Sequence, residues 1–115
     1  MKLWIDDVRQ APEGYVWLQS VNEAKDVIRL LEDPTSVPSY DPSQRNTRRE
    51  PIIIDLVDID HDAGAYAYDG GDYIKLLDWF EATGRNYPIR IHSMNPVGVA
   101  NMRAIIRKNN WKEVF

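Results

Sequence analysis

The run from Pro51 to Ile59 constrains the fold more than any other part of the chain. Isoleucine, leucine and valine fill every position from Ile52 to Ile59 except Asp55 and Asp58. A run this rich in isoleucine, leucine and valine is typical of a parallel strand that is buried on both faces. Because parallel strands need long crossover connections, usually helical, the run predicts an α/β domain.

Shorter apolar runs and helix signals around this strand complete the predicted fold. Further strands are expected at Lys2 to Asp6, Tyr15 to Leu18 and Pro88 to Ile91, with a candidate fifth at Trp111 to Phe115. A capping box at Ser20 and Glu23 begins a helix over about 20 to 32. Asp72 is expected to cap a second helix that Gly84 ends, and Asn95 with Pro96 to begin a third that Asn109 or Asn110 ends.

One connection is unusual. The segment from Asp7 to Gly14 joins the first two strands and is too short for an ordinary helical crossover. The sequence therefore predicts a three-layer α/β domain with a mostly parallel sheet of about five strands, in which the first helix is missing.

Residues 1 to 115 are expected to form a single domain. Residues 33 to 50 interrupt its pattern with prolines and end in an arginine-rich stretch, which predicts a flexible insertion. A surface insertion is the simpler interpretation; the alternative is an arginine-bearing flap over a phosphate site.

The composition excludes several classes of function. The chain has no cysteine, which rules out disulfides, thiolate zinc sites and thiol catalysis and fits a reducing cytoplasm. No apolar run approaches the roughly 20 residues that cross a bilayer, and the start lacks a signal-peptide pattern. A net charge of -4 argues against non-specific DNA binding. We expect a cytoplasmic protein without a membrane segment, and a phosphorylated ligand remains compatible if a metal ion assists.

Polar clusters follow three of the predicted strands. Asp6-Asp7-Val8-Arg9 ends the first, Asp60-His61-Asp62 follows the run that begins at Pro51, and His92-Ser93-Met94-Asn95 follows the strand that ends at Ile91. In open α/β sheets, ligands bind outside the carboxyl ends of the strands. The three clusters are therefore predicted to surround one polar site.

Carboxylates from two strand ends favour a divalent metal. Asp6, Asp7 and Asp60 offer the oxygen ligands that Mg²⁺ or Mn²⁺ prefers. Asp58 projects to the same side of its strand as Asp60, at a deeper position. An isolated Asp-Asp pair also occurs at many turns, so the second acidic strand end is what supports the metal site.

His61 and His92, the only histidines, are candidates for proton transfer, with Asp60 beside them as the third predicted catalytic residue. In phosphoester cleavage, one imidazole accepts a proton from the attacking water and the other donates to the leaving oxygen. Asp60 or Asp62 could orient His61. The alternative is that His61 only ties its loop to a backbone carbonyl.

Arg9, Ser93 and Asn95 are the predicted phosphate-binding residues. Ser93 and Asn95 open a helix, and a helix start with a hydroxyl beside it favours anions. Asn95 is also expected to act as an ordinary N-cap. Arg9 either binds phosphate bidentately or pairs with a carboxylate such as Asp7.

These clusters resemble the motifs of the cyclic-phosphate-processing receiver-like domains, a divergent branch of the response-regulator receivers. The matching stretches are Asp6-Asp7-Val8-Arg9-Gln10-Ala11-Pro12, Ile59-Asp60-His61-Asp62, and His92-Ser93-Met94-Asn95-Pro96-Val97-Gly98 with Met102. The resemblance implies a receiver, flavodoxin-like fold and the processing of cyclic phosphates. Unlike ordinary receivers, the chain lacks the first helix and a lysine after a fifth strand, which argues against phosphorelay signalling.

Three functional hypotheses follow. The first is a metal-dependent phosphoesterase that acts on an RNA 2',3'-cyclic end or a cyclic nucleotide. The second is a non-catalytic module that binds or sequesters a nucleotide-like ligand. The third is a degenerate receiver used for protein contacts. In the first two the partner is a small phosphorylated ligand or an RNA terminus.

Overall fold

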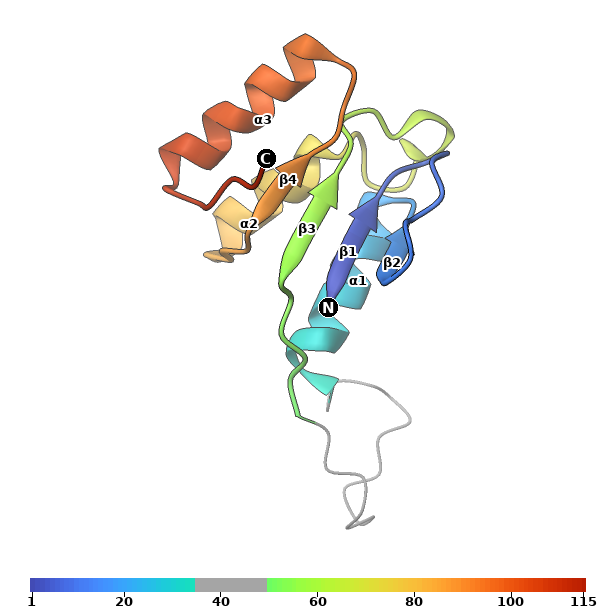
Figure 1. The fold of residues 1–115 in the computed structure, drawn as a ribbon, viewed down its shortest axis with the longest axis vertical. Coiled ribbons are helices and arrows are strands. Elements are labelled where there is room, and N and C mark those ends of the chain that lie inside the picture. Colours follow the sequence, from blue (N-terminus) through green and yellow to red (C-terminus); the bar gives the residue numbers. More distant parts are fainter. Residues whose placement is uncertain (35–49) are drawn as a thin grey trace.

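The computed structural model describes residues 1–34 and 50–115, so the predicted insertion at 33 to 50 falls almost entirely outside the described residues. The elements along the chain are β1 (Lys2–Ile5), β2 (Tyr15–Leu18), α1 (Val21–Glu32), β3 (Leu56–Ile59), the 3-10 turn η2 (Gly64–Tyr66), α2 (Ile74–Thr83), β4 (Ile89–Ile91) and α3 (Pro96–Lys108). The strands form one parallel sheet in the order β2-β1-β3-β4 (Figure 1). The predicted α/β class and parallel sheet are confirmed.

The missing first helix is also confirmed. β1 and β2 pair in parallel from Lys2↔Tyr15 to Ile5↔Leu18, and only a loop connects them. Two indole groups pin this loop to the sheet, because Trp4 Nε1 donates to the carbonyl of Arg9 at 2.8 Å and Trp17 Nε1 donates to the carbonyl of Asp6 at 2.8 Å. Tryptophan side chains thus hold the crossover where a helix would ordinarily do so.

All helices of the described chain belong to one core. Leu3, Ile5, Val57, Ile59 and Ile89 point from the sheet into this core, where they are fully buried among apolar side chains of α1, α2 and α3. In Figure 1, α1 and α2 lie behind the sheet, and the contacts of α2 with both other helices place it between them. The described residues therefore form two layers, where three were expected.

The winding of the chain explains the difference. The crossovers β2→β3 and β3→β4 run in the same direction across the sheet, and right-handed connections put their helices on the same face. Only the step β1→β2 runs the other way. Its missing helix is one that would have covered the second face, so that face keeps polar and aromatic side chains.

The strand count is four, below the predicted five. The chain end makes a single parallel bridge, Ile89↔Glu113, in which the Val114 amide donates to the carbonyl of Ile89 at 2.7 Å. β3 is shorter than the run 51 to 59, because the Ile52 amide donates to the carbonyl of Leu31 and the Asp55 amide to that of Met1. Ile52 and Asp55 thus make single backbone hydrogen bonds to other segments instead of extending the strand.

Most predicted helix ends are confirmed. Ser20 Oγ accepts from the Glu23 amide, Asn95 Oδ1 accepts from the Gly98 amide, and Gly84 and Asn110 lie in the left-handed region at φ 69° and 54°. The prediction that Asp72 caps α2 is wrong. Its carboxylate accepts from the Ala63 amide at 3.0 Å and so holds the loop before the helix instead.

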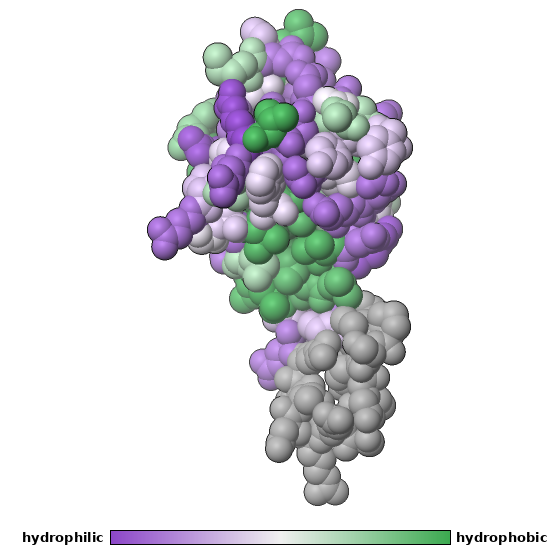
Figure 2. Space-filling model, turned by 90° about the vertical axis from the view of Figure 1, so that its right-hand side faces the viewer, coloured by the Kyte–Doolittle hydropathy of each residue, from purple (hydrophilic) through white to green (hydrophobic). Residues whose placement is uncertain are grey.

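The two ends of the molecule differ in polarity. The coloured surface in Figure 2 is mainly hydrophilic on its upper part, with an apolar area on its lower part. Leu30, Ile52 and Ile53 are exposed at the amino ends of the strands, opposite the three polar clusters. A polar ligand is therefore expected at the carboxyl ends.

The buried face of α3 can be tested by two truncations. Ile106 is 1% exposed and Val97 is 71% exposed on the same helix. Ile106→Ala should lower the free energy of unfolding by about 2–5 kcal/mol, because it leaves a cavity in the core. Val97→Ala should change it by less than about 0.5 kcal/mol. Equal losses in urea denaturation would mean that α3 does not pack by this face.

Candidate functional site

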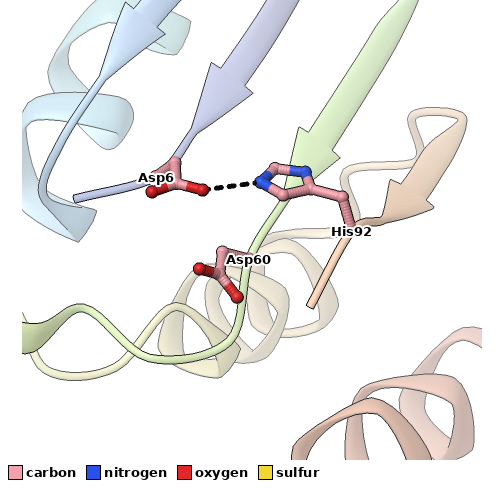
Figure 3. Close-up of side chains that lie close together, drawn as sticks. All are labelled: Asp6, Asp60 and His92. Carbon is pink, nitrogen blue, oxygen red and sulfur yellow. Dashed lines mark hydrogen bonds and ion pairs between the residues drawn. The ribbon is translucent and has the colours of Figure 1, made fainter. Parts of the chain in front are cut away.

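Three of the predicted residues meet at the carboxyl ends of the strands. Asp6, Asp60 and His92 directly follow β1, β3 and β4, and their side chains lie close together in Figure 3. One donor atom from each lies within 4.8 Å of the other two. The strand register brings them together, because Ile5, Ile59 and Ile91, the residues just before them, are cross-strand neighbours.

Asp6 is fully buried and fully partnered. Its Oδ1 accepts from the amides of Val8 at 3.0 Å and Arg9 at 2.8 Å, and its Oδ2 lies 3.0 Å from Nε2 of His92. Burial by itself would raise the pKa of Asp6, but these hydrogen bonds outweigh it and lower the pKa below its ordinary value. The carboxylate form is therefore stabilised at the centre of the site.

His92 is held between two carboxylates. Nδ1 lies 2.7 Å from Oδ1 of Asp58 while Nε2 faces Asp6, and the ring stacks on Trp4 with centroids 3.8 Å apart and planes 5° from parallel. The His92 side chain is 7% exposed. Its position and orientation are fixed from three sides.

Asp58 is the residue that sequence reasoning underestimated. It is fully buried, and its Oδ2 accepts from the Tyr15 hydroxyl at 3.3 Å and from Arg90 at 3.2 Å, while its Oδ1 meets His92. The signal was present as a period of two: Trp4, Asp58 and Arg90 each precede a strand-end residue by two positions, so they share its face. They form the layer beneath the site on the uncovered face.

His61 lies apart from this group of three donors. Its amide donates to Oδ1 of Asp60 at 2.7 Å, and its Nδ1 lies 2.8 Å from Oδ1 of Asp62. The hydrogen bond with His61 is the main cause that lowers the pKa of Asp62. Nε2 of His61 has no hydrogen-bond partner among the described residues, so one ring nitrogen remains available for a ligand.

Gly98 is what lets the His61 ring pack against the start of α3. A Cβ at Gly98 would lie 2.4 Å from Cγ of His61, far inside van der Waals contact. Asn95 Nδ2 approaches both oxygens of Asp62 at 3.4 Å and so ties the same helix start to the His61 loop. The close approach that Gly98 permits is thus to an imidazole.

Asp7 faces a different neighbour. A Cβ at Gly64 would lie 2.3 Å from Asp7 Oδ2, so the Asp7 carboxylate packs against this glycine. Burial and the charges of Asp6 and Asp60 raise the pKa of Asp7. Asp7 lies outside the group of three donors, and its role as a metal ligand stays a prediction.

The predicted phosphate-binding residues lie at the edge of the site that Asp6, Asp60 and His92 form. Arg9 is exposed, with Nη1 3.5 Å from the carbonyl of His92, and Ser93 Oγ accepts from the Asn95 amide at 3.1 Å. Arg9 makes no ion pair with a described carboxylate, so the alternative of a pair with Asp7 is not seen within residues 1–34 and 50–115.

A comparison with protein families decides the membership of the chain. The family model of the cyclic-phosphate processing receiver domain matches residues 1–108. The chain belongs to this family. The predicted resemblance is confirmed, and the family's name connects this receiver domain with cyclic-phosphate processing. No curated protein and no solved structure matches it.

Within the described ranges, no helix has the length and apolar character needed to cross a bilayer.

The contact between His61 and Gly98 leads to a prediction about a substitution at Gly98. By helix propensity alone, Gly98→Ala would stabilise α3 by about 1 kcal/mol. Overpacking against the imidazole should cost about 1–3 kcal/mol and displace the ring, so we expect a net loss of stability and shifted His61 ring resonances in NMR spectra. Ala100→Gly, on the exposed side of the helix, should leave those resonances in place. Unchanged His61 resonances in Gly98→Ala would contradict the packing.

The raised pKa of Asp7 leads to a prediction about the stability of the fold. The folded state holds this proton more tightly than the unfolded chain, so the charged carboxylate destabilises the fold above its pKa. Asp7→Asn should therefore raise the melting temperature of the metal-free protein at pH 7, and the gain should vanish as the pH falls below the ordinary carboxyl pKa of 3.8.

Asp62→Asn is the matched control with the opposite sign. The lowered pKa of Asp62 means that its charge stabilises the fold at pH 7, and this contribution is lost as the pH falls through the lowered value. If both variants melt below the parent at pH 7, the repulsion assigned to Asp7 is wrong.

Proposed function

We propose that this receiver domain is a metal-dependent phosphoesterase that opens a cyclic phosphate, either an RNA 2',3'-cyclic end or a cyclic nucleotide. The observation that carries the proposal is the convergence of Asp6, Asp60 and His92 within 4.8 Å at three strand ends. The family membership supplies the substrate class.

The donor set fits a divalent ion. Nε2 of His92 and Oδ2 of Asp6 are 3.0 Å apart. Two ligands about 2.1 Å from one octahedral ion lie about 3 Å apart when they are adjacent. Carboxylate oxygens suit Mg²⁺ and Mn²⁺, whereas an imidazole nitrogen is a poorer ligand for Mg²⁺, so the set favours Mn²⁺. Asp7 stands beside the group as a further candidate ligand.

The contacts of His92 support a ligand role over proton transfer. A metal-binding histidine ordinarily donates its other ring N–H to a carboxylate, which fixes the tautomer and the ring orientation. Asp58 is in this position, 2.7 Å from Nδ1. Asp58 is accordingly proposed as the positioning residue of His92.

His61 is the better candidate for proton transfer. If Nδ1–H donates to Asp62, Nε2 carries a lone pair and can accept the proton of the attacking water as its oxygen bonds to phosphorus. The P–O bond to one ribose oxygen breaks, and His61 can return the proton to that oxygen. Arg9, Ser93 and Asn95 would orient the phosphate at the start of α3, where helix amides favour an anion. When bound, the divalent ion supplies charge neutralisation at the phosphoryl oxygens.

Hydrolysis of a nucleoside 2',3'-cyclic phosphate tests the proposal. We expect turnover with Mn²⁺ and none with EDTA. His61→Gln should lower the rate by about 10²–10⁴-fold and leave Mn²⁺ binding intact, since it removes only the proton acceptor. Asp60→Asn should lower both the rate of hydrolysis and the affinity for Mn²⁺. The control is Asp78→Asn, an exposed carboxylate on α2. If folded Asp60→Asn turns over like the parent, the proposal is wrong.

Calorimetry with Mn²⁺ tests the role of Asp58 without any turnover. Asp58→Asn should weaken Mn²⁺ binding by about 10–100-fold, the usual effect of losing a partner of a metal-bound histidine. Asp55→Asn, an exposed carboxylate just before β3, is the control and should bind Mn²⁺ like the parent. Equal affinities of the two variants would remove the positioning role.

One observation favours the non-catalytic alternative. Asp6 and both nitrogens of His92 already have partners within the protein, so these residues do not need a metal ion to satisfy their hydrogen-bonding groups. A binding module predicts stoichiometric binding of the cyclic phosphate in calorimetry, with the ligand recovered unchanged. Product formation in the same sample would exclude it.

A further inference from the structure

We infer that a groove on the outer face of α3 binds additional phosphates of the substrate, which makes that substrate an RNA strand ending in a cyclic phosphate rather than a free cyclic nucleotide. The inference rests on the proposed function, because it takes the site at the strand ends as the place of the cyclic phosphate.

The groove begins at the site and has the size of a ligand pocket. Its volume is about 540 Å³, and its lining residues are Ser93, Met94, Pro96, Val99, Ala100, Arg103 and Arg107. Ligand pockets commonly measure about 300–1,000 Å³. Ser93 belongs both to the predicted phosphate-binding residues and to the groove, so a ligand can continue from one into the other.

The groove runs along one stripe of the helix. Pro96, Ala100, Arg103 and Arg107 recur at helical spacing on the side of α3 that faces away from the core residues Met102 and Ile106. At 1.5 Å per residue, Arg103 lies about 10 Å and Arg107 about 16 Å along the axis from Pro96. Both arginines therefore lie farther along the helix from the strand ends than Ser93 does.

The charge of the groove complements phosphate. Two guanidinium groups line it, and no aspartate or glutamate is among its lining residues. Glu113 accepts from Nε of Arg103 at 2.6 Å, and the guanidinium carbon lies 5.4 Å from the centre of the Phe115 ring. These contacts orient the side chain and leave its terminal nitrogens without a hydrogen-bond partner in the described chain. Arg107 is exposed and makes no ion pair with any residue in 1–34 or 50–115. Arginine binds phosphate bidentately through such free nitrogens.

These features select a strand over a mononucleotide. A nucleoside cyclic phosphate carries one phosphate and would occupy only the Ser93 end of the groove. A strand that ends in the cyclic phosphate carries further phosphates along its backbone, and these can reach Arg103 and Arg107. Met94, Pro96 and Val99 add apolar surface for ribose and base. The net charge of -4 gives the protein no general attraction to a nucleic-acid strand, so strand binding needs local positive charge such as that of this groove.

Fluorescence anisotropy and calorimetry with defined probes test the inference. The probes are a nucleoside 2',3'-cyclic phosphate, an RNA tetranucleotide ending in a 2',3'-cyclic phosphate, and a cyclic dinucleotide, whose two phosphates lie in a closed ring. All proteins carry His61→Gln to slow hydrolysis, and chromatography checks that each probe survives. The variants are Arg107→Gln and Arg103→Gln. Lys108→Gln is the control, because Lys108 neighbours Arg107 but pairs with Glu81 and does not line the groove.

The tetranucleotide should bind tighter than the mononucleotide. Each arginine variant should weaken tetranucleotide binding by about tenfold and lower its salt slope by roughly 0.7, the loss of about one phosphate contact, with mononucleotide binding unchanged. Lys108→Gln should behave like the parent. The inference would be overturned by equal affinity for the mononucleotide and the tetranucleotide, or by no measurable binding of the tetranucleotide. Equal effects of Arg107→Gln and Lys108→Gln on tetranucleotide binding would also overturn it.

Two further outcomes distinguish a failure of this inference from a failure of the proposed function. If the cyclic dinucleotide binds tighter than the tetranucleotide and depends equally on Arg107, the assignment to a strand is wrong. If the strand binds in the expected Arg107-dependent way but proteins with His61 intact do not open its cyclic phosphate, the groove stands and the proposed hydrolysis fails.

Discussion

The hydrogen-bonded chain Asp58–His92–Asp6 joins three strands through one imidazole, and the geometry of the site depends on it. Asp58 comes from β3, His92 follows β4 and Asp6 follows β1, with contacts of 2.7 and 3.0 Å at the two ring nitrogens. Burying two carboxylates carries a desolvation cost that apolar side chains would avoid. The chain is therefore better explained by the orientation it gives to His92 and Asp6 than by stability.

The uncovered face of the sheet makes this arrangement feasible. A helix after β1 would require apolar side chains where Trp4, Asp58 and Arg90 stand in one row of the register. Without that helix, Asp58 can accept from Arg90 and Tyr15 at the rim while it remains buried itself. The loss of one crossover helix and the gain of a polar layer beneath the site are thus two aspects of the same change.

The two histidines, similar in sequence context, differ in surroundings. His92 is enclosed by carboxylates and Trp4, whereas His61 rests on the first turn of α3 and keeps one nitrogen free of partners in the described chain. Two glycines permit this, since Gly98 makes room for the His61 ring and Gly64 for the Asp7 carboxylate. This contrast is the basis for proposing different roles for the two imidazoles: metal ligand for His92 and proton acceptor for His61.

Local patterns in the sequence determined the elements and the edge of the sheet that carries the site. The capping residues Ser20 and Asn95, the glycine at 84 and the apolar run ending at Ile59 act within a few residues, so they could be recognised without the fold. The family motifs did the same for membership in the receiver domains. Only the tertiary structure decided which side chains contact one another. Asp58 contacts His92, Asp7 packs on Gly64, and Asp72 accepts from the Ala63 amide. It also decided that no helix of the described chain covers the second face of the sheet. These partnerships depend on strand order and crossover handedness, which bring together residues far apart in the chain. Local spacing shows at most which face of a strand a residue occupies, and not which residue it contacts.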